Sequence, residues 1–134
     1  MIYVLDSNTI SFMLDGDRNV IARYRRESDK GSVVIIPPVV YYEVQRGLLA
    51  AKLNKKLMQF DILCREIEQP EFEKRVWRKA AEIWATLRQT GKTLDDDGDI
   101  FIAAYCLVNN YPLVTNNTKD FERIDGMTLI DWKE

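Results

Sequence analysis

Short apolar runs rich in β-branched residues alternate along this chain with longer stretches whose apolar residues recur at helical spacing. The short runs, at residues 2–5, 33–36, 113–115 and 127–130, predict buried strands, and a brief further candidate lies at 66–68. Helical spacing predicts helices over residues 10–14, 20–30, 37–48, 53–63, 70–90 and 97–109. This alternation predicts an α/β fold with three α/β/α layers and a central, mainly parallel sheet of about five strands.

The bulk properties predict one globular domain over residues 1–134. The chain is 46% hydrophobic and 30% charged, and it contains neither an internal repeat nor a low-complexity linker. Cys64 and Cys106 stand among apolar residues, which favours free thiols in a reducing compartment. The three tryptophans, Trp77, Trp84 and Trp132, are expected in the core. No apolar run is long enough to span a membrane, so we expect a cytoplasmic protein without a membrane partner.

Charge and composition restrict the chemistry available to the chain. Its net charge of -2 provides no global attraction to nucleic acid, so an RNA-binding role needs bound cations or local basic clusters. Two such clusters occur at residues 23–26 and 52–56, and each can equally be an ordinary solvated helix face. The absence of histidine excludes catalysis by Ser-His-Asp or Cys-His groups and a histidine-bound zinc.

Several acidic residues follow predicted strands or open predicted helices. Asp6 ends the first strand, Glu43 lies on the helix after the second, and Asp99 opens the helix that leads to residues 113–115. In parallel α/β sheets, ligands bind beyond the carboxyl ends of the strands, so these groups can face one cleft. Clustered carboxylates repel one another, and a divalent cation with oxygen ligands removes that conflict. The pattern therefore favours a Mg²⁺ or Mn²⁺ site.

Each acidic residue also has a purely structural interpretation. Asp6 alone can be a helix cap, and Glu43 alone can be a solvated helix residue. At least two carboxylates of the run Asp95 to Asp99 are explained by the favourable field of a helix N-terminus. It is the joint placement of the acids that favours a metal site.

Three segments resemble the PIN domain, and more narrowly the VapC-type toxins of bacterial type II toxin–antitoxin pairs. The opening IYVLDSNTI is similar to that family's strand-Asp-(Ser/Thr)-Asn start, and VVIIPPVVYYEVQRG resembles its strand and Glu-bearing helix. The most specific segment is DIFIAAYCLVNNYPLVTNNTKDFERIDGMTLIDW, which resembles the family's Asp-x-x-Ile-Ala-Ala helix, its Val-Thr-Asn strand end and its terminal Trp. Together they cover essentially the whole chain.

The resemblance implies specific site residues. Asp6 and Asp99 would be the principal Mg²⁺ ligands, with Mn²⁺ as a substitute, and Glu43 would be the third acidic and catalytic group. The family's fourth acidic position falls on Asn116 and Asn117, so that role passes to Asp120 or is lost. The resemblance also implies that three polar residues orient the carboxylates, namely Ser7, Asn8 and Thr115.

The resemblance further implies endoribonuclease activity, with tRNA as the expected target, a VapB-like antitoxin as partner, and a homodimer. Two other classes remain open at this stage. A catalytically silent PIN-like binding module is favoured only by the weakened fourth acidic position. A receiver-like phosphoacceptor domain would need paired acids after the first strand, whereas Asp6 stands alone and Ile36 runs directly into Pro37.

Overall fold

A single parallel sheet organises the computed structural model, which describes residues 1–134. Its strands lie in the order β2-β1-β3-β4, and every neighbouring pair is parallel. The chain therefore moves outward from β1 in one direction to reach β2 and in the other to reach β3, which makes the β1–β3 boundary the topological switch point. The strand bounds are β1 Ile2–Leu5, β2 Val33–Ile35, β3 Leu113–Val114 and β4 Leu129–Ile130.

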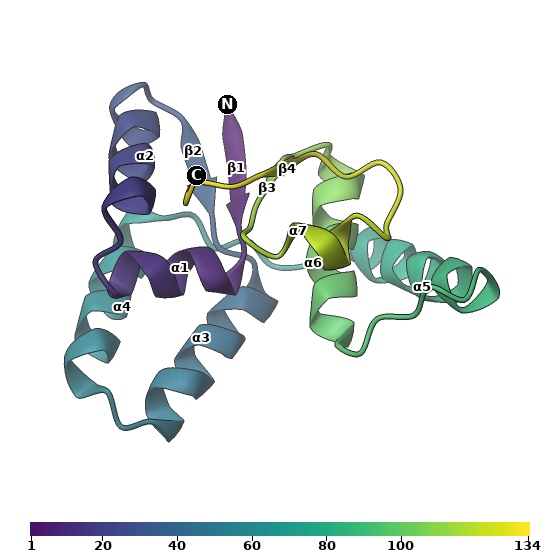
Figure 1. Ribbon diagram of the computed structural model, residues 1–134, viewed down its shortest axis with the longest axis horizontal. Helices are drawn as coiled ribbons and strands as arrows, with labels where there is room; N and C mark the ends of the chain where they lie inside the picture. Colours follow the sequence, from purple (N-terminus) through teal and green to yellow (C-terminus); the bar gives the residue numbers. More distant parts are fainter.

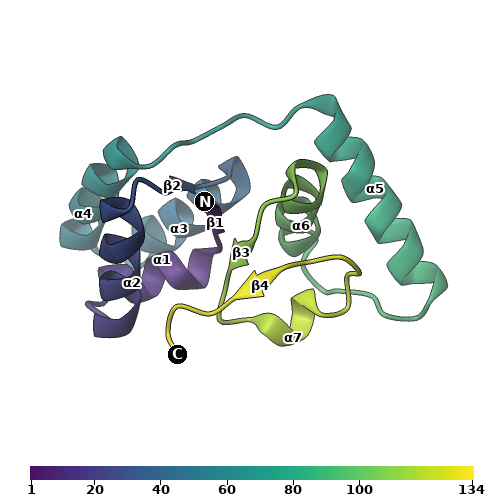
Figure 2. The same ribbon diagram turned by 90° about the horizontal axis from the view of Figure 1, so that it is seen from above.

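Helices cover both faces of the sheet, as the sequence predicted. Helices α1 to α4 lie on one side, and α5 and α6 lie on the other (Figures 1 and 2). None of the helices combines the length and the apolar character needed to cross a bilayer. The helix bounds are α1 Ser7–Leu14, α2 Arg18–Asp29, α3 Pro38–Ala50, α4 Asn54–Glu66, α5 Lys74–Gln89, α6 Asp97–Asn109 and α7 Thr118–Phe121.

The helix α6 is the most deeply buried helix because it lies between the sheet and α5. Its apolar residues surround the helix axis, and the side chains of Ile100 and of residues 102–106 are buried. The outer helix α5 is amphipathic instead, and it packs Val76, Ala80 and Ile83 against α6 while its other face meets solvent. This arrangement holds the N-terminus of α6, which carries Asp99, against the carboxyl edge of the sheet.

Four expectations from the sequence require correction. The sheet has four strands, because α4 continues to Glu66 and the segment 66–68 contributes a single bridge, between Glu68 and Ile35. That segment then crosses to the other side of the sheet to reach α5, so it leaves the β2 edge at once (Figure 2). Helix α5 begins at Lys74 and not at Pro70, and β4 begins at Leu129 and not at residue 127.

The expectation of a tryptophan core is correct for one residue of three. Trp132 is 1% exposed, whereas Trp77 and Trp84 are 46% and 47% exposed on the outer face of α5. Both cysteines are free thiols, as expected. Cys106 is buried and Cys64 is partly exposed.

Candidate active site

Asp6 and Thr115 meet because β1 and β3 are neighbouring parallel strands in register. Leu5 pairs with Val114, so the next residue of each strand emerges at the same edge of the sheet. The Thr115 hydroxyl donates a hydrogen bond of 2.8 Å to Asp6 Oδ2. The Ser7 amide donates one of 2.8 Å to Asp6 Oδ1, which also makes Asp6 the cap of α1. Both oxygens of this buried carboxylate are therefore held in place.

A polar network behind Asp6 fixes the threonine in turn. Asn8 Nδ2 donates a hydrogen bond of 3.3 Å to the Thr115 hydroxyl, and the backbone N–H of Asn117 donates one of 2.9 Å to the same oxygen. Thr115 therefore contacts the Asp6 carboxylate directly, whereas Asn8 contacts Thr115 and not the carboxylate. Ser7 holds Asp6 through its backbone amide.

Glu43 reaches the site from α3. The buried stripe Val40, Val44 and Leu48 faces the core, and Glu43 lies beside this stripe, partly buried. Its Oε1 atom is buried and has no hydrogen-bond partner. Its Oε2 atom lies beside Gly98 of α6, where a β-carbon would stand only 3.0 Å away. The helices α3 and α6 therefore approach closely at the carboxylate.

Asp96 is a member of the cluster that the sequence did not single out. It caps α6, where its Oδ1 accepts a hydrogen bond of 2.8 Å from the Gly98 amide. A β-carbon on Gly98 would lie 3.0 Å from this Oδ1 and 3.0 Å from Glu43 Oε2, so both carboxylates lie against the same glycine. An aspartate directly before an apolar helical run, with a glycine two residues later, is typical of a helix N-cap, and this pattern would have identified Asp96 from the sequence. Asp97 and Asp99 lie in the first turn of α6, consistent with the expected helix-dipole role of this run.

The carboxylates raise one another's pKa values. Burial is the largest cause of the raised pKa of Asp6, and the charge of Asp96 adds to it against the hydrogen bonds from Thr115 and Ser7. Burial, then the charges of Asp96 and Asp6, raise the pKa of Glu43 to about 7. Burial, then Asp6, Asp96, Glu43 and Asp120, raise the pKa of Asp99 to about 7. The three predicted acids are thus electrostatically coupled in one site.

The residues of this cluster suit a divalent cation. All the candidate ligand atoms are carboxylate oxygens, the donors that Mg²⁺ and Mn²⁺ prefer, and Glu43 Oε1 is a buried oxygen without a partner. Burial is the largest cause of the raised pKa values of Glu43 and Asp99, and a bound cation would remove the mutual repulsion that adds to it. No three of the acidic side chains already stand in a metal-binding arrangement.

Among the residues considered for the fourth acidic position, Asp120 is the one whose charge acts on Asp99, and the two asparagines have other hydrogen-bond partners. Asp120 contributes to the raised pKa of Asp99 and accepts a hydrogen bond of 3.1 Å from Asn117 Nδ2. Asn116 Nδ2 donates instead to Asp131, at 2.9 Å. Asn117 therefore acts here as a support for Asp120, and the Asn116 side chain is engaged with the C-terminal segment.

A family model of the PIN domain matches residues 3–127. The chain belongs to the PIN domain family. Among its relatives is Ribonuclease VapC2 of Rickettsia felis, 27% identical over 133 residues that cover 98% of both chains. Ribonuclease VapC1 of Haemophilus influenzae strain R2866 is 23% identical over 133 residues, again 98% of both chains.

Solved structures agree with this assignment. A chain of the VapBC2 complex from Rickettsia felis, bound to a DNA fragment from its promoter, matches with a TM-score of 0.89 at 26% identity, over 98% of this chain and 99% of that one. The VapBC-1 structure from nontypeable Haemophilus influenzae has a TM-score of 0.86 at 22% identity over 100% of both chains, which shows the fold alone. The resemblance to VapC-type PIN domains is confirmed, and the receiver-like alternative is excluded by the family.

Proposed function

We propose that this protein is the toxin of a type II toxin–antitoxin pair and acts as a Mg²⁺-dependent endoribonuclease in the cytoplasm, with tRNA as its substrate. The observation that carries the proposal is the coupled cluster of Asp6, Glu43, Asp96 and Asp99 at the switch point of the sheet, where two pKa values are raised to about 7. The VapC relatives, whose names describe ribonucleases, support the activity.

In this mechanism Asp6 and Asp99 would hold the metal, and Asp120 on α7 would add negative charge beside Asp99. A divalent cation in such a site neutralises negative charge on a phosphate and lowers the pKa of water. Thr115 and the Ser7 amide keep the Asp6 carboxylate in one orientation. Glu43, with a pKa of about 7, accepts the proton of the attacking water at its unpartnered Oε1. The chain contains no histidine, and Asp99, whose pKa is also about 7, is assigned to the metal, so the proton transfer falls to Glu43.

The direct test is cleavage of bulk tRNA by the purified protein. We expect cleavage in Mg²⁺ or Mn²⁺ and none in EDTA. If folded, antitoxin-free protein cuts neither tRNA nor any other cellular RNA with either metal, the catalytically silent binding module becomes the better account.

A protein antitoxin is the proposed partner, because the matched structures are VapBC complexes, one of them bound to promoter DNA. Tagged protein isolated from its source cells should carry a small DNA-binding protein, and the isolated complex should cleave tRNA more slowly than the freed toxin. Recovery of the toxin alone, already fully active, would argue against a stoichiometric antitoxin.

A homodimer is also proposed, with the outer face of α5 as the contact. Trp77 and Trp84 are nearly half exposed there, and they border an apolar hollow of about 360 Å³ together with Phe101. Exposed aromatic surface of this kind is enriched at protein interfaces. The double substitution Trp77→Ser/Trp84→Ser should halve the mass measured by light scattering. The exposed Met58→Ser on α4 serves as control, and a mass unchanged in the double variant rules out this face.

A further inference from the structure

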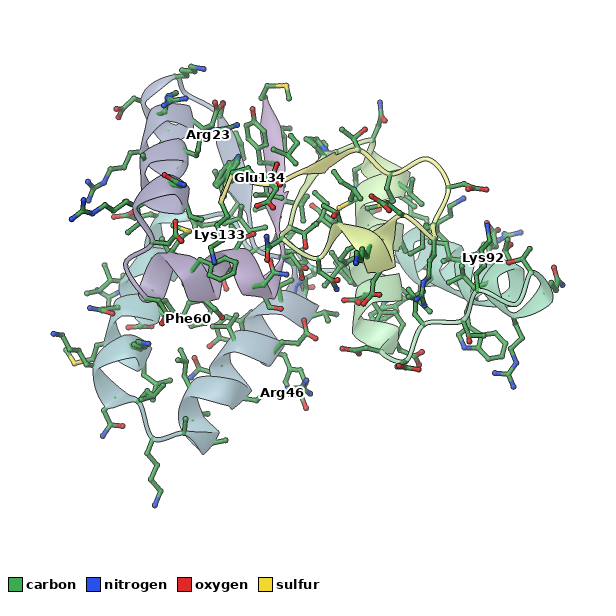
Figure 3. The ribbon with its side chains drawn as sticks, in the orientation of Figure 1. Arg23, Arg46, Phe60, Lys92, Lys133 and Glu134 are labelled. Atoms are coloured by element: carbon green, nitrogen blue, oxygen red, sulfur yellow. The ribbon has the colours of Figure 1, made fainter.

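Arg46 is an arginine beside the acidic cluster that no step of the mechanism above uses. It follows Glu43 by one helical turn on α3, and its guanidinium lies over the Tyr42 ring, 4.9 Å from the centroid. Figure 3 shows Arg46 on the side of α3 that faces α6. Stacking on an aromatic ring orders a long side chain before any ligand arrives, which lowers the entropic cost of binding.

The charge of Arg46 acts on the site while remaining unpaired. Arg46 is the one positive group whose charge lowers the pKa of Glu43. The Tyr42 side chain is the largest cause of the raised pKa of Arg46, and the charges of Glu43 and Asp96 add to it. Arg46 nevertheless takes part in none of the ion pairs of the structure. Its charge is therefore not paired with a carboxylate, and the planar guanidinium, which interacts with the Tyr42 side chain, matches the geometry of a phosphate.

A hollow of about 450 Å³ extends from the acidic cluster past Arg46, between α1, α3 and α4. Ser7 and Glu43 line its end at the active site, and Lys56 lines it on α4. Lys56 already pairs with Asp15, so Arg46 is the unpaired cation of this hollow. Because Arg46 lies one helical turn from Glu43 and both line this hollow, a strand whose scissile phosphate lies at the carboxylates and that continues into the hollow would pass Arg46.

We propose that Arg46 binds the phosphate adjacent to the scissile phosphate, and that the RNA strand continues along the hollow between α1, α3 and α4. This inference rests on the proposed function. It explains how a chain of net charge -2 with a strongly acidic centre retains a polyanion, because a single ordered cation beside the site offsets the local repulsion.

The test separates phosphate binding from catalysis. RNA binding is measured by the anisotropy of end-labelled bulk tRNA in Mg²⁺ over a series of salt concentrations, with Asp99→Asn present throughout to block cleavage. Adding Arg46→Gln should raise Kd about tenfold and reduce the slope of log K against log salt by about 0.7 to 0.9, the value for one lost phosphate contact. Arg46→Lys should restore much of the slope but less of the affinity.

The control is Arg65→Gln, which removes the same charge from an exposed arginine at the opposite end of α4 from Lys56. It should leave Kd within about twofold and the salt slope unchanged. In protein with Asp99 intact, Arg46→Gln should raise KM for tRNA about tenfold and change kcat by less than about threefold.

Two results would overturn the proposal. In the first, Arg46→Gln lowers kcat or shifts its pH profile while Kd and the salt slope stay at their original values, so that Arg46 is only a counter-charge for Glu43. In the second, RNA binding is absent in every variant. Loss of cleavage alone has a different meaning: if the protein cuts no RNA but Arg46→Gln still weakens RNA binding, the nuclease proposal fails and the phosphate site stands.

Discussion

Replacing Asp99 by asparagine is expected to lower the rate of tRNA cleavage by about two to three orders of magnitude. Asp99 opens α6 beside Asp6, Glu43 and Asp96, and the charges of these neighbours raise its pKa. Asparagine keeps the shape of the side chain but removes the negative charge that would hold a divalent cation. The loss should therefore appear in kcat/KM at saturating Mg²⁺, measured on bulk tRNA.

The same substitution should stabilise the protein when metal is absent. Burial and like charges make the ionised Asp99 unfavourable, so its removal relieves repulsion. In EDTA at pH 8 we expect Asp99→Asn to unfold at a higher temperature than the original protein, although it is less active. Opposite changes in activity and stability distinguish a functional carboxylate from one that merely supports the fold.

The matched control is Asp97→Asn. Asp97 lies in the same first turn of α6 but is exposed, so its loss removes one favourable helix-dipole interaction worth about 0.3 to 1 kcal/mol. It should lower thermal stability slightly and leave cleavage within about threefold. Equal losses of activity in the Asp97→Asn and Asp99→Asn proteins would remove the special role assigned to Asp99.

Metal-free protein is expected to lose about 2 kcal/mol of stability as the pH rises from 5 to 8, after allowance for solvent screening of half-buried groups. The pKa values of Glu43 and Asp99 rise from their ordinary 4.5 and 3.8 to about 7 in the folded protein. Between these values the folded state binds more protons than the unfolded state, so the free energy of unfolding falls with increasing pH. The fall should be complete about one pH unit above the folded-state pKa values of about 7, where the carboxylates are ionised in both states.

Urea unfolding at pH 5, 6, 7 and 8 in EDTA measures this dependence. The double variant Glu43→Gln/Asp99→Asn removes both groups and should flatten the curve over this range. Saturating Mg²⁺ should restore stability to the original protein mainly at pH 8, because ligand binding requires the ionised carboxylates. A free energy of unfolding that rises steadily from pH 5 to pH 8 in the original protein would contradict the raised pKa values.

Local pattern was sufficient to identify most elements of this fold. The helix at residues 97–109 was predicted at its observed bounds because a run of acidic residues directly precedes a dense apolar run. Two strand predictions ended within a residue of the observed β2 and β3. Asp6, Glu43 and Asp99 were recognised because each follows a strand or opens a helix, and parallel connectivity brings such positions to one edge.

The sequence by itself therefore determined the fold class, which depends on local periodicity and on the order of elements, and its motifs were sufficient to indicate the family and the candidate acids. Only the tertiary structure decided how those acids are supported. Hydrogen bonds between residues far apart in the chain join Thr115 to Asp6 and Asn116 to Asp131. The absence of a carboxylate partner for Arg46 likewise depends on which elements pack beside α3. The exposure of Trp77 was decided in the same way, because an amphipathic helix indicates how wide its apolar face is but not how much of that face a neighbouring helix covers.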